Sequence, residues 1–106
     1  MRRGDIVTGG VYAHKPRPAL IVQDDRFDAT DSLTVCPFTS TETEAPLLRV
    51  PVTADEINGL DQDSFLMVDK ITTVRRSNAQ TVLGSIEAKA LVEFERRLLV
   101  FLGFGA

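Results

Sequence analysis

The chain has 106 residues, of which 43% are hydrophobic and 25% are charged, and this predicts one soluble domain over residues 1–106. The net charge of −3 excludes a strongly basic nucleic-acid-binding protein, so any site for a polyanion must be a local patch. The single cysteine, Cys36, excludes an internal disulfide, and the lack of a long apolar stretch or signal peptide predicts a cytoplasmic protein without a membrane span.

Four strands are predicted in the first half of the chain. Gly9 and Gly10 indicate a bulge or bend in the first of them. Pro37 indicates a strand end or an edge position for the third, because proline donates no hydrogen bond to a sheet. Polar connections over 24–31 and 39–46 follow the second and third strands. The predicted strands are Asp5–Tyr12, Ala19–Gln23, Ser32–Phe38 and Leu47–Val52.

The second half begins with a capping-box pattern, in which Thr53 is followed three residues later by Glu56. This pattern predicts a short helix that ends at Gly59. Three short strands are then expected, over Ser64–Val68, Ile71–Val74 and Thr81–Leu83.

A long amphipathic helix is predicted at the C-terminal end, with Ser85 as its N-cap and Gly103 as its stop. Its apolar side chains recur at helical spacing on one face, at Leu91, Phe94, Leu98 and Phe101. The wide face of this helix and the small size of the chain also predict a dimer. Short strands followed by one helix predict a small, mostly antiparallel barrel with a helix packed on it.

A stiff loop precedes the second predicted strand. Pro16 and Pro18 restrict the backbone on both sides of Arg17, and the apolar run Ala19–Val22 follows directly. A guanidinium presented in this way is suited to a phosphate, because little ordering is needed on binding. The alternative is a surface arginine in a proline-rich turn.

No cofactor or metal is predicted. The chain has no Cys/His cluster for zinc and no glycine-rich phosphate loop. Cys36 lies in an apolar run and is expected to be a small buried residue rather than a nucleophile. Four aspartates were considered as metal ligands, but their spacing does not match a calcium loop and solvated turns explain them equally. They are Asp24, Asp25, Asp28 and Asp31.

An ordered set of motifs resembles the MazF/PemK family of toxin endoribonucleases. The opening Arg2–Val7, the segment Lys15–Gln23 and the segment Val35–Ser40 each resemble a family motif. Gly59–Leu60 and Ser64–Val74 match later landmarks, so the resemblance covers nearly the whole chain. It implies an SH3-like barrel with a C-terminal helix, of the PemK/CcdB-like type, that acts as a homodimer.

The resemblance also implies a function. Family members are toxins of type II toxin–antitoxin modules that cut single-stranded RNA, here expected to be messenger RNA, without a metal. The cut leaves a 2′,3′-cyclic phosphate and a 5′-hydroxyl. The expected partners are single-stranded RNA, a second copy of the chain and a cognate acidic antitoxin that lies over the arginine groove.

The family's catalytic arginine and threonine fall on Arg17 and Thr39. Thr39 is alternatively a strand-end hydroxyl bonded to its own backbone. The glutamate motif that many members carry in the first loop is missing here, so His14 becomes the candidate base, since its pKa range suits proton transfer; otherwise it is an ordinary loop histidine. The predicted RNA-binding residues are Lys15, Pro18, Gln23, Ser40, Thr41, Asp69 and Lys70.

Two other functions remain open at this stage. CcdB-type gyrase poisons share the barrel, but they bind gyrase through a C-terminal Trp-Gly-Ile, whereas this chain ends in Phe104-Gly105-Ala106 and has no tryptophan. An inactive SH3-like binding module would use Arg17 and Thr39 only to hold a peptide.

Overall fold

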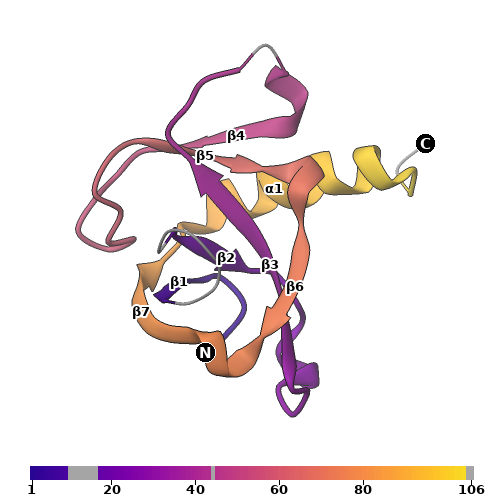
Figure 1. Cartoon of the computed structure of the whole chain (residues 1–106). Helices are drawn as coiled ribbons and strands as arrows, with labels where there is room; N and C mark the ends of the chain where they lie inside the picture. The colour runs from indigo at the N-terminus through magenta and orange to yellow at the C-terminus, as the bar shows by residue number, and fades with distance from the viewer. Residues whose placement is uncertain (10–16, 44, 105–106) are drawn as a thin grey trace.

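The structure is a computed structural model that describes residues 1–9, 17–43 and 45–104. These residues form seven strands and one α-helix, joined in places by short 3-10 turns (Figure 1). The helix is α1 (Ala88–Leu102). The strands are β1 (Asp5–Gly9), β2 (Ala19–Ile21), β3 (Ser32–Thr39), β4 (Arg49–Val52), β5 (Ser64–Met67), β6 (Thr72–Arg75) and β7 (Ala79–Ser85).

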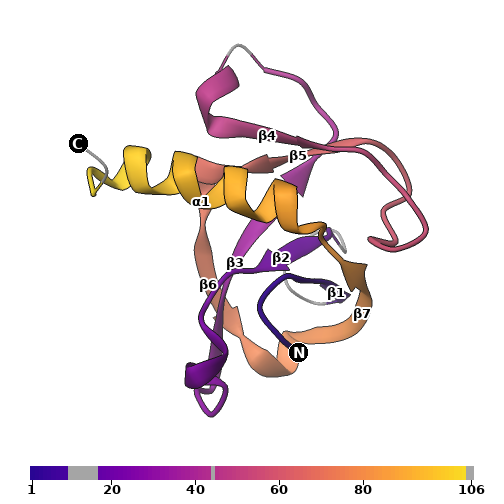
Figure 2. The ribbon, with the colours of Figure 1, turned by 180° about the vertical axis from the view of Figure 1, so that it is seen from behind.

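The strands make one antiparallel sheet in the order β4-β5-β3-β2-β1-β7, and β6 pairs separately with β3. Helix α1 lies across one face of this bent sheet, as Figure 2 shows from behind. The predicted fold class, mostly β with a C-terminal helix, is confirmed. Within the described residues β4 and β7 are not paired with each other, so the barrel is open rather than closed by hydrogen bonds.

Both faces of the central strands are buried, because successive side chains point to opposite sides of a strand. Ile6 and Leu20 point to the core under the helix, where Phe94 is 1% exposed. Val7 and Ala19, one residue along the same strands, enter a second cluster on the other side of the sheet. Burial on both faces explains why these segments read as apolar runs.

Pro37 lies inside the central strand β3 and is buried, so its predicted place at a strand end or edge is wrong. The backbone N–H of Phe38 donates to Pro18 on the β2 side (3.1 Å), so the nitrogen of Pro37 faces the other side. On that other side, β3 pairs with β6 as far as Val35 and with β5 from Phe38 onward. The missing donor therefore falls in the gap between two partner strands.

Two predicted helix starts are also wrong. Residues 56–58 form a turn instead of a short helix, because one oxygen of Asp55 accepts from the N–H groups of Ile57 (2.9 Å) and Asn58 (2.7 Å). Ser85 belongs to β7, where it pairs with Asp5, and Glu87 is the N-cap of α1. Gly103 ends the helix as predicted, with φ 85°.

The remaining strands lie close to their predicted ranges. β1 and β7 change register between Thr8 and Gly9, which agrees with the expected bulge at the first glycine. Residues 10–12, the end of the first predicted strand, lie outside the described residues. None of the helices formed by the described residues is both long and apolar enough to cross a membrane.

Gly84→Ala should destabilise the protein by more than about 1 kcal/mol, because the new Cβ would meet the backbone carbonyl oxygen of Ile57. Backbone atoms cannot move aside as a flexible side chain can. Thermal and urea melts check this. The neighbouring exposed change Ser85→Ala is the control and should stay within about 0.5 kcal/mol of the parent protein; equal melting of both variants would contradict the close packing of β7 on residues 57–58.

Candidate functional site: a groove at the end of the central strand

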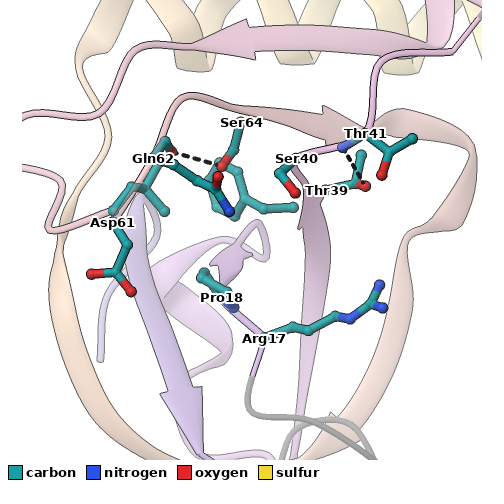
Figure 3. Close-up of a pocket in the computed structure, with 10 residues that line it drawn as sticks. Arg17, Pro18, Thr39, Ser40, Thr41, Asp61, Gln62 and Ser64 are labelled. Atoms are coloured by element: carbon teal, nitrogen blue, oxygen red, sulfur yellow. Dashed lines mark hydrogen bonds between the residues drawn. The ribbon is translucent and has the colours of Figure 1, made fainter.

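An open cavity of about 380 Å³ lies where β3 ends, beside the start of β2 (Figure 3). Its third side is the β4–β5 connection, residues 53–63. The cavity is lined by Arg17, Pro18, Phe38, Thr39, Ser40, Thr41, Leu60, Asp61, Gln62 and Ser64. Five residues predicted for catalysis or RNA binding are thus brought together here, namely Arg17, Pro18, Thr39, Ser40 and Thr41.

Arg17 is exposed, whereas the chain directly after it is fixed. Pro18 is half-buried, its carbonyl oxygen accepts from the N–H of Phe38 (3.1 Å), and Ala19 is fully buried. The guanidinium extends from this anchor on the side of the groove where Thr39 and Thr41 lie (Figure 3). An exposed cation on a fixed base is the arrangement that the sequence predicted for phosphate binding.

Thr39 is the last residue of β3, and its hydroxyl oxygen accepts a hydrogen bond from the backbone N–H of Thr41 (3.2 Å). The local backbone contact considered as an alternative is therefore present. It does not use up the group, because a hydroxyl can accept and donate at the same time. The bond fixes the oxygen and leaves its proton available to a ligand in the groove.

The opposite wall was missed by the sequence analysis. It consists of Leu60, Asp61 and Gln62, from the connection between β4 and β5, together with Ser64, the first residue of β5. Gly59–Leu60 and Ser64 were noted only as landmarks of the resemblance. The sequence does contain a signal for an exposed loop here, since the polar run Asp61–Asp63 lies between two buried positions, Leu60 and Ser64. Its place beside Arg17 depends on the fold.

The other predicted site residues are not among those that line the described cavity. Two of them, His14 and Lys15, lie outside the described residues, so the structure does not place them. The side chain of Gln23 donates to the carbonyl oxygen of Phe27 (3.0 Å) and accepts from the N–H of Thr34 (2.9 Å), so it holds the β2–β3 connection together. Lys70 is exposed and does not line the cavity. A role of these residues in RNA binding stays a prediction.

Asp69 does not line the cavity either and forms a partly buried ion pair with Arg49 (2.6 Å); the two side chains are 24% and 11% exposed. Burial pushes the pKa of Asp69 upward, but the hydrogen bond and positive charge of Arg49 outweigh it, so the pKa lies below its ordinary value. Nε of Arg49 is buried without a partner among the described residues. This arginine therefore depends on Asp69 for compensation of its charge.

Two of the four aspartates considered as metal ligands, Asp24 and Asp25, have structural partners. Asp24 accepts from the N–H of Arg26 (2.9 Å) and pairs with its guanidinium, and both contacts lower the pKa of Asp24. Asp25 accepts from the N–H of Arg3 (2.7 Å). Among the residues that the structure describes, no cluster of three or more His, Cys, Asp or Glu side chains is arranged to hold a metal.

Cys36 is fully buried in β3, as predicted, and burial raises the pKa of its thiol to about 12. The thiol is therefore protonated at neutral pH, and it does not line the groove. A nucleophilic role at this site is excluded for it.

The fold and the groove define a small open β-barrel that presents a cation and several hydroxyl groups to an anionic ligand. A family model described as PemK-like, MazF-like toxin of type II toxin–antitoxin systems matches residues 2–102. The chain belongs to this family, which confirms the resemblance drawn from its motifs.

A sequence relative agrees with this assignment, and solved structures agree with the fold. The chain is 53% identical over 106 residues to a "Probable endoribonuclease MazF" of Mycolicibacterium smegmatis, and the match covers 97% of both proteins. Among solved structures, the MazE–MazF complex of Deinococcus radiodurans matches with a TM-score of 0.81 and 24% identity, over 97% of this chain and 95% of that one. The Mycobacterium tuberculosis toxin MazF-mt6 matches with a TM-score of 0.79 and 24% identity, over 95% of this chain and 97% of that one.

Asp69→Asn should destabilise the protein at pH 7, because it leaves the positive charge of Arg49 without a partner. The expected loss is about 2 kcal/mol, which lies between the free energies typical of breaking an exposed and a fully buried ion pair. The lowered pKa means that the pair stabilises the fold above the unfolded pKa of Asp, about 3.9, and that this contribution fades as pH falls through the folded pKa. Urea melts at pH 7 and at pH 3 should therefore show a smaller difference between parent and variant at pH 3. A constant difference would contradict the ion pair.

Proposed function

We propose that the protein is a toxin endoribonuclease that cleaves single-stranded RNA, with messenger RNA as its substrate, in this groove. The observation that carries the proposal is the placement of Arg17 and Thr39 on one groove, with the Thr39 hydroxyl oxygen held by the N–H of Thr41 (3.2 Å). Family membership and the 53% identical relative, named as a probable endoribonuclease, support the same activity. They favour it over the gyrase-poison and binding-module alternatives.

The reaction is a transfer within the RNA chain. A base removes the proton of a ribose 2′-hydroxyl, the O2′–P bond forms, the P–O5′ bond breaks, and the leaving 5′-oxygen takes up a proton. The products are a 2′,3′-cyclic phosphate and a 5′-hydroxyl, and no metal is needed. The crowded phosphate in the transition state carries extra negative charge on its oxygens, which is where preorganised donors accelerate a reaction most.

Arg17 supplies the positive charge in this scheme, and its planar fork matches two phosphate oxygens. The hydroxyl of Thr39 donates a second hydrogen bond to the phosphate. His14 is our candidate for the base, on the strength of its unperturbed pKa range, and it lies outside the described residues.

The proposed setting is the cytoplasm, with an antitoxin as regulatory partner. Structures of related toxins include complexes with the antitoxin, as in the MazE–MazF complex of Deinococcus radiodurans. An acidic antitoxin segment would compete with RNA for the Arg17 cation, because carboxylates and phosphates present similar oxygens to a guanidinium.

We also propose that the protein is a homodimer through the C-terminal half of α1. Three members of the predicted helix face are used inside the chain, because Phe94 is buried and Leu91 and Leu98 pack against the core. The fourth member, Phe101, belongs instead to a set of large apolar side chains that is left exposed, and together this set exceeds the scattered exposure usual for a monomer. It comprises Leu99, Val100, Phe101, Leu102 and Phe104, beside Leu47.

Arg17→Ala should reduce RNA cleavage by about a hundredfold or more, because it removes the cation at the phosphate. Thr39→Ala should lower the cleavage rate about tenfold, which corresponds to the loss of one neutral hydrogen bond. Thr39→Ser should restore most of the rate, because serine keeps the hydroxyl group. The assay is primer extension on one long RNA, with and without EDTA, beside thermal melts. His14→Ala should lower the rate and change its pH profile if His14 is the base.

Arg75→Ala is the matched control for Arg17→Ala, since Arg75 is also exposed and lies outside the groove. It should cleave at the parent rate. Full activity of a folded Arg17→Ala variant would overturn the proposed site.

Val100→Glu and Phe101→Glu together should convert a dimer into a monomer, because two charges would be buried at the interface. Light scattering at micromolar concentration should give about twice the 11.7 kDa of one chain for the parent protein and one chain mass for the variant. Val82→Glu, on the exposed side of β7, is the control and should remain dimeric. A monomeric parent protein would contradict the dimer.

A further inference from the structure

The two walls of the groove differ in charge. Arg17 lies on one side of the cavity, and the carboxylate of Asp61 lies on the opposite side, with Pro18 between them (Figure 3). Gln62 projects from the same wall as Asp61 (Figure 3). A groove that served only to hold a phosphate backbone would gain nothing from a carboxylate in its wall, because like charges repel.

Asp61 and Gln62 are exposed, and their side chains make no hydrogen bond or ion pair with any described residue. The other aspartates of this connection are used to build it. Asp55 accepts from the N–H groups of Ile57 (2.9 Å) and Asn58 (2.7 Å), and Asp63 accepts from the N–H of Ala54 (2.8 Å). The fold therefore does not explain Asp61, whereas it does explain the aspartates on both sides.

The wall that carries Asp61 is held rigidly. Asn58, only 4% exposed, donates to the carbonyl oxygen of Thr53 (2.8 Å) and accepts from the N–H of Leu60 (3.0 Å). Gly59 has φ 72°, which favours glycine, and a Cβ there would meet the carbonyl oxygen of Leu83.

The far end of the wall is fixed as well. The hydroxyl of Ser64 donates to the carbonyl oxygen of Gln62 (2.9 Å), and Leu60 is part of the core. Asp61 and Gln62, whose side chains have no partner among the described residues, are thus carried on a fixed support, as recognition of a specific group requires.

The partner that suits this wall is a base. Single-stranded RNA is recognised through the Watson–Crick edges of its unstacked bases. A carboxylate has only acceptors, so it selects an edge that offers donors. Guanine offers two adjacent donors, N1–H and the N2 amino group, whereas adenine and cytosine each offer one amino group beside an acceptor nitrogen. Uracil has one N–H between two carbonyl oxygens.

We propose that Asp61, assisted by Gln62, determines the cleavage sequence by accepting hydrogen bonds from a guanine next to the scissile phosphate. The proposal rests on the endoribonuclease function proposed above and extends it to the choice of substrate. The phosphate lies on Arg17 and Thr39, and the neighbouring guanine lies across the groove with N1–H and N2–H on the Asp61 carboxylate. A good bidentate contact of this kind gives about 10- to 100-fold discrimination against the wrong base.

The test begins with a randomised single-stranded RNA pool, whose cleaved ends are sequenced to find the preferred site. Matched oligonucleotides then carry guanine, inosine or adenine at the flanking positions, and kcat/KM is measured for each. Guanine should be preferred within two nucleotides of the cut, and inosine, which lacks the N2 amino group, should be cleaved about tenfold more slowly.

Asp61→Asn should still cleave RNA but should lose most of the preference for guanine over inosine, because an amide offers one acceptor and one donor. Glu56→Gln is the matched control, since it removes the same charge from an exposed position in the same connection and Glu56 does not line the cavity. It should keep the preference. Gln62→Ala, with its fold checked by thermal melting, gives a second variant if Asp61→Asn is unstable, and it should weaken the preference.

The outcomes separate the two proposals. Cleavage by the parent protein without a guanine preference, or an unchanged preference in Asp61→Asn and Gln62→Ala, would overturn base recognition by this wall and leave the endoribonuclease function standing. No cleavage of any RNA in the pool would overturn the endoribonuclease function, and base recognition with it.

Discussion

The whole structure depends on the pairing of the central strand β3. It pairs with β2 along one side, and on its other side it changes partner from β6 to β5. The change falls at Pro37, which could not supply a hydrogen bond to either of them. This change of partner bends the sheet, so that β4 and β5 extend away from β1 and β7. Helix α1 covers the core between these two pairs of strands (Figures 1 and 2).

The groove follows from the same strand. Thr39 is the last residue of β3, and the carbonyl oxygen of Pro18 accepts from the N–H of Phe38 in the same strand. Arg17, two residues before β2, is therefore held close to the end of β3. Because β5 begins to pair with β3 at Phe38 and Thr39, the connection that precedes β5 is brought to the same place. The cation, the hydroxyl and the opposite wall are thus assembled by one set of backbone contacts.

Helix α1 holds the end of the β3–β4 connection that lies away from the groove. Arg97 pairs with Glu93 and donates from one nitrogen to the carbonyl oxygens of Pro46 (2.8 Å) and Arg49 (2.7 Å). Arg49 in turn binds Asp69. The β3–β4 connection, which starts at the groove after Thr39, is therefore anchored on the helix at Pro46, and the regular structure among its described residues is one short 3-10 turn, Pro46–Leu48.

The sequence by itself determined the strands of the core, the C-terminal helix with its stop at Gly103, and the position of Arg17 directly before a buried strand. These features depend on local physics: apolar runs, fixed proline torsions and a glycine cap. Only the tertiary structure placed Ser85 in a strand, since pairing with Asp5 outweighed its preference for an N-cap, and only it turned Gln23 and Asp69 toward structural partners. It also brought Asp61 across from Arg17, because residues this far apart in the chain meet only when the pairing of β3 with β5 is fixed.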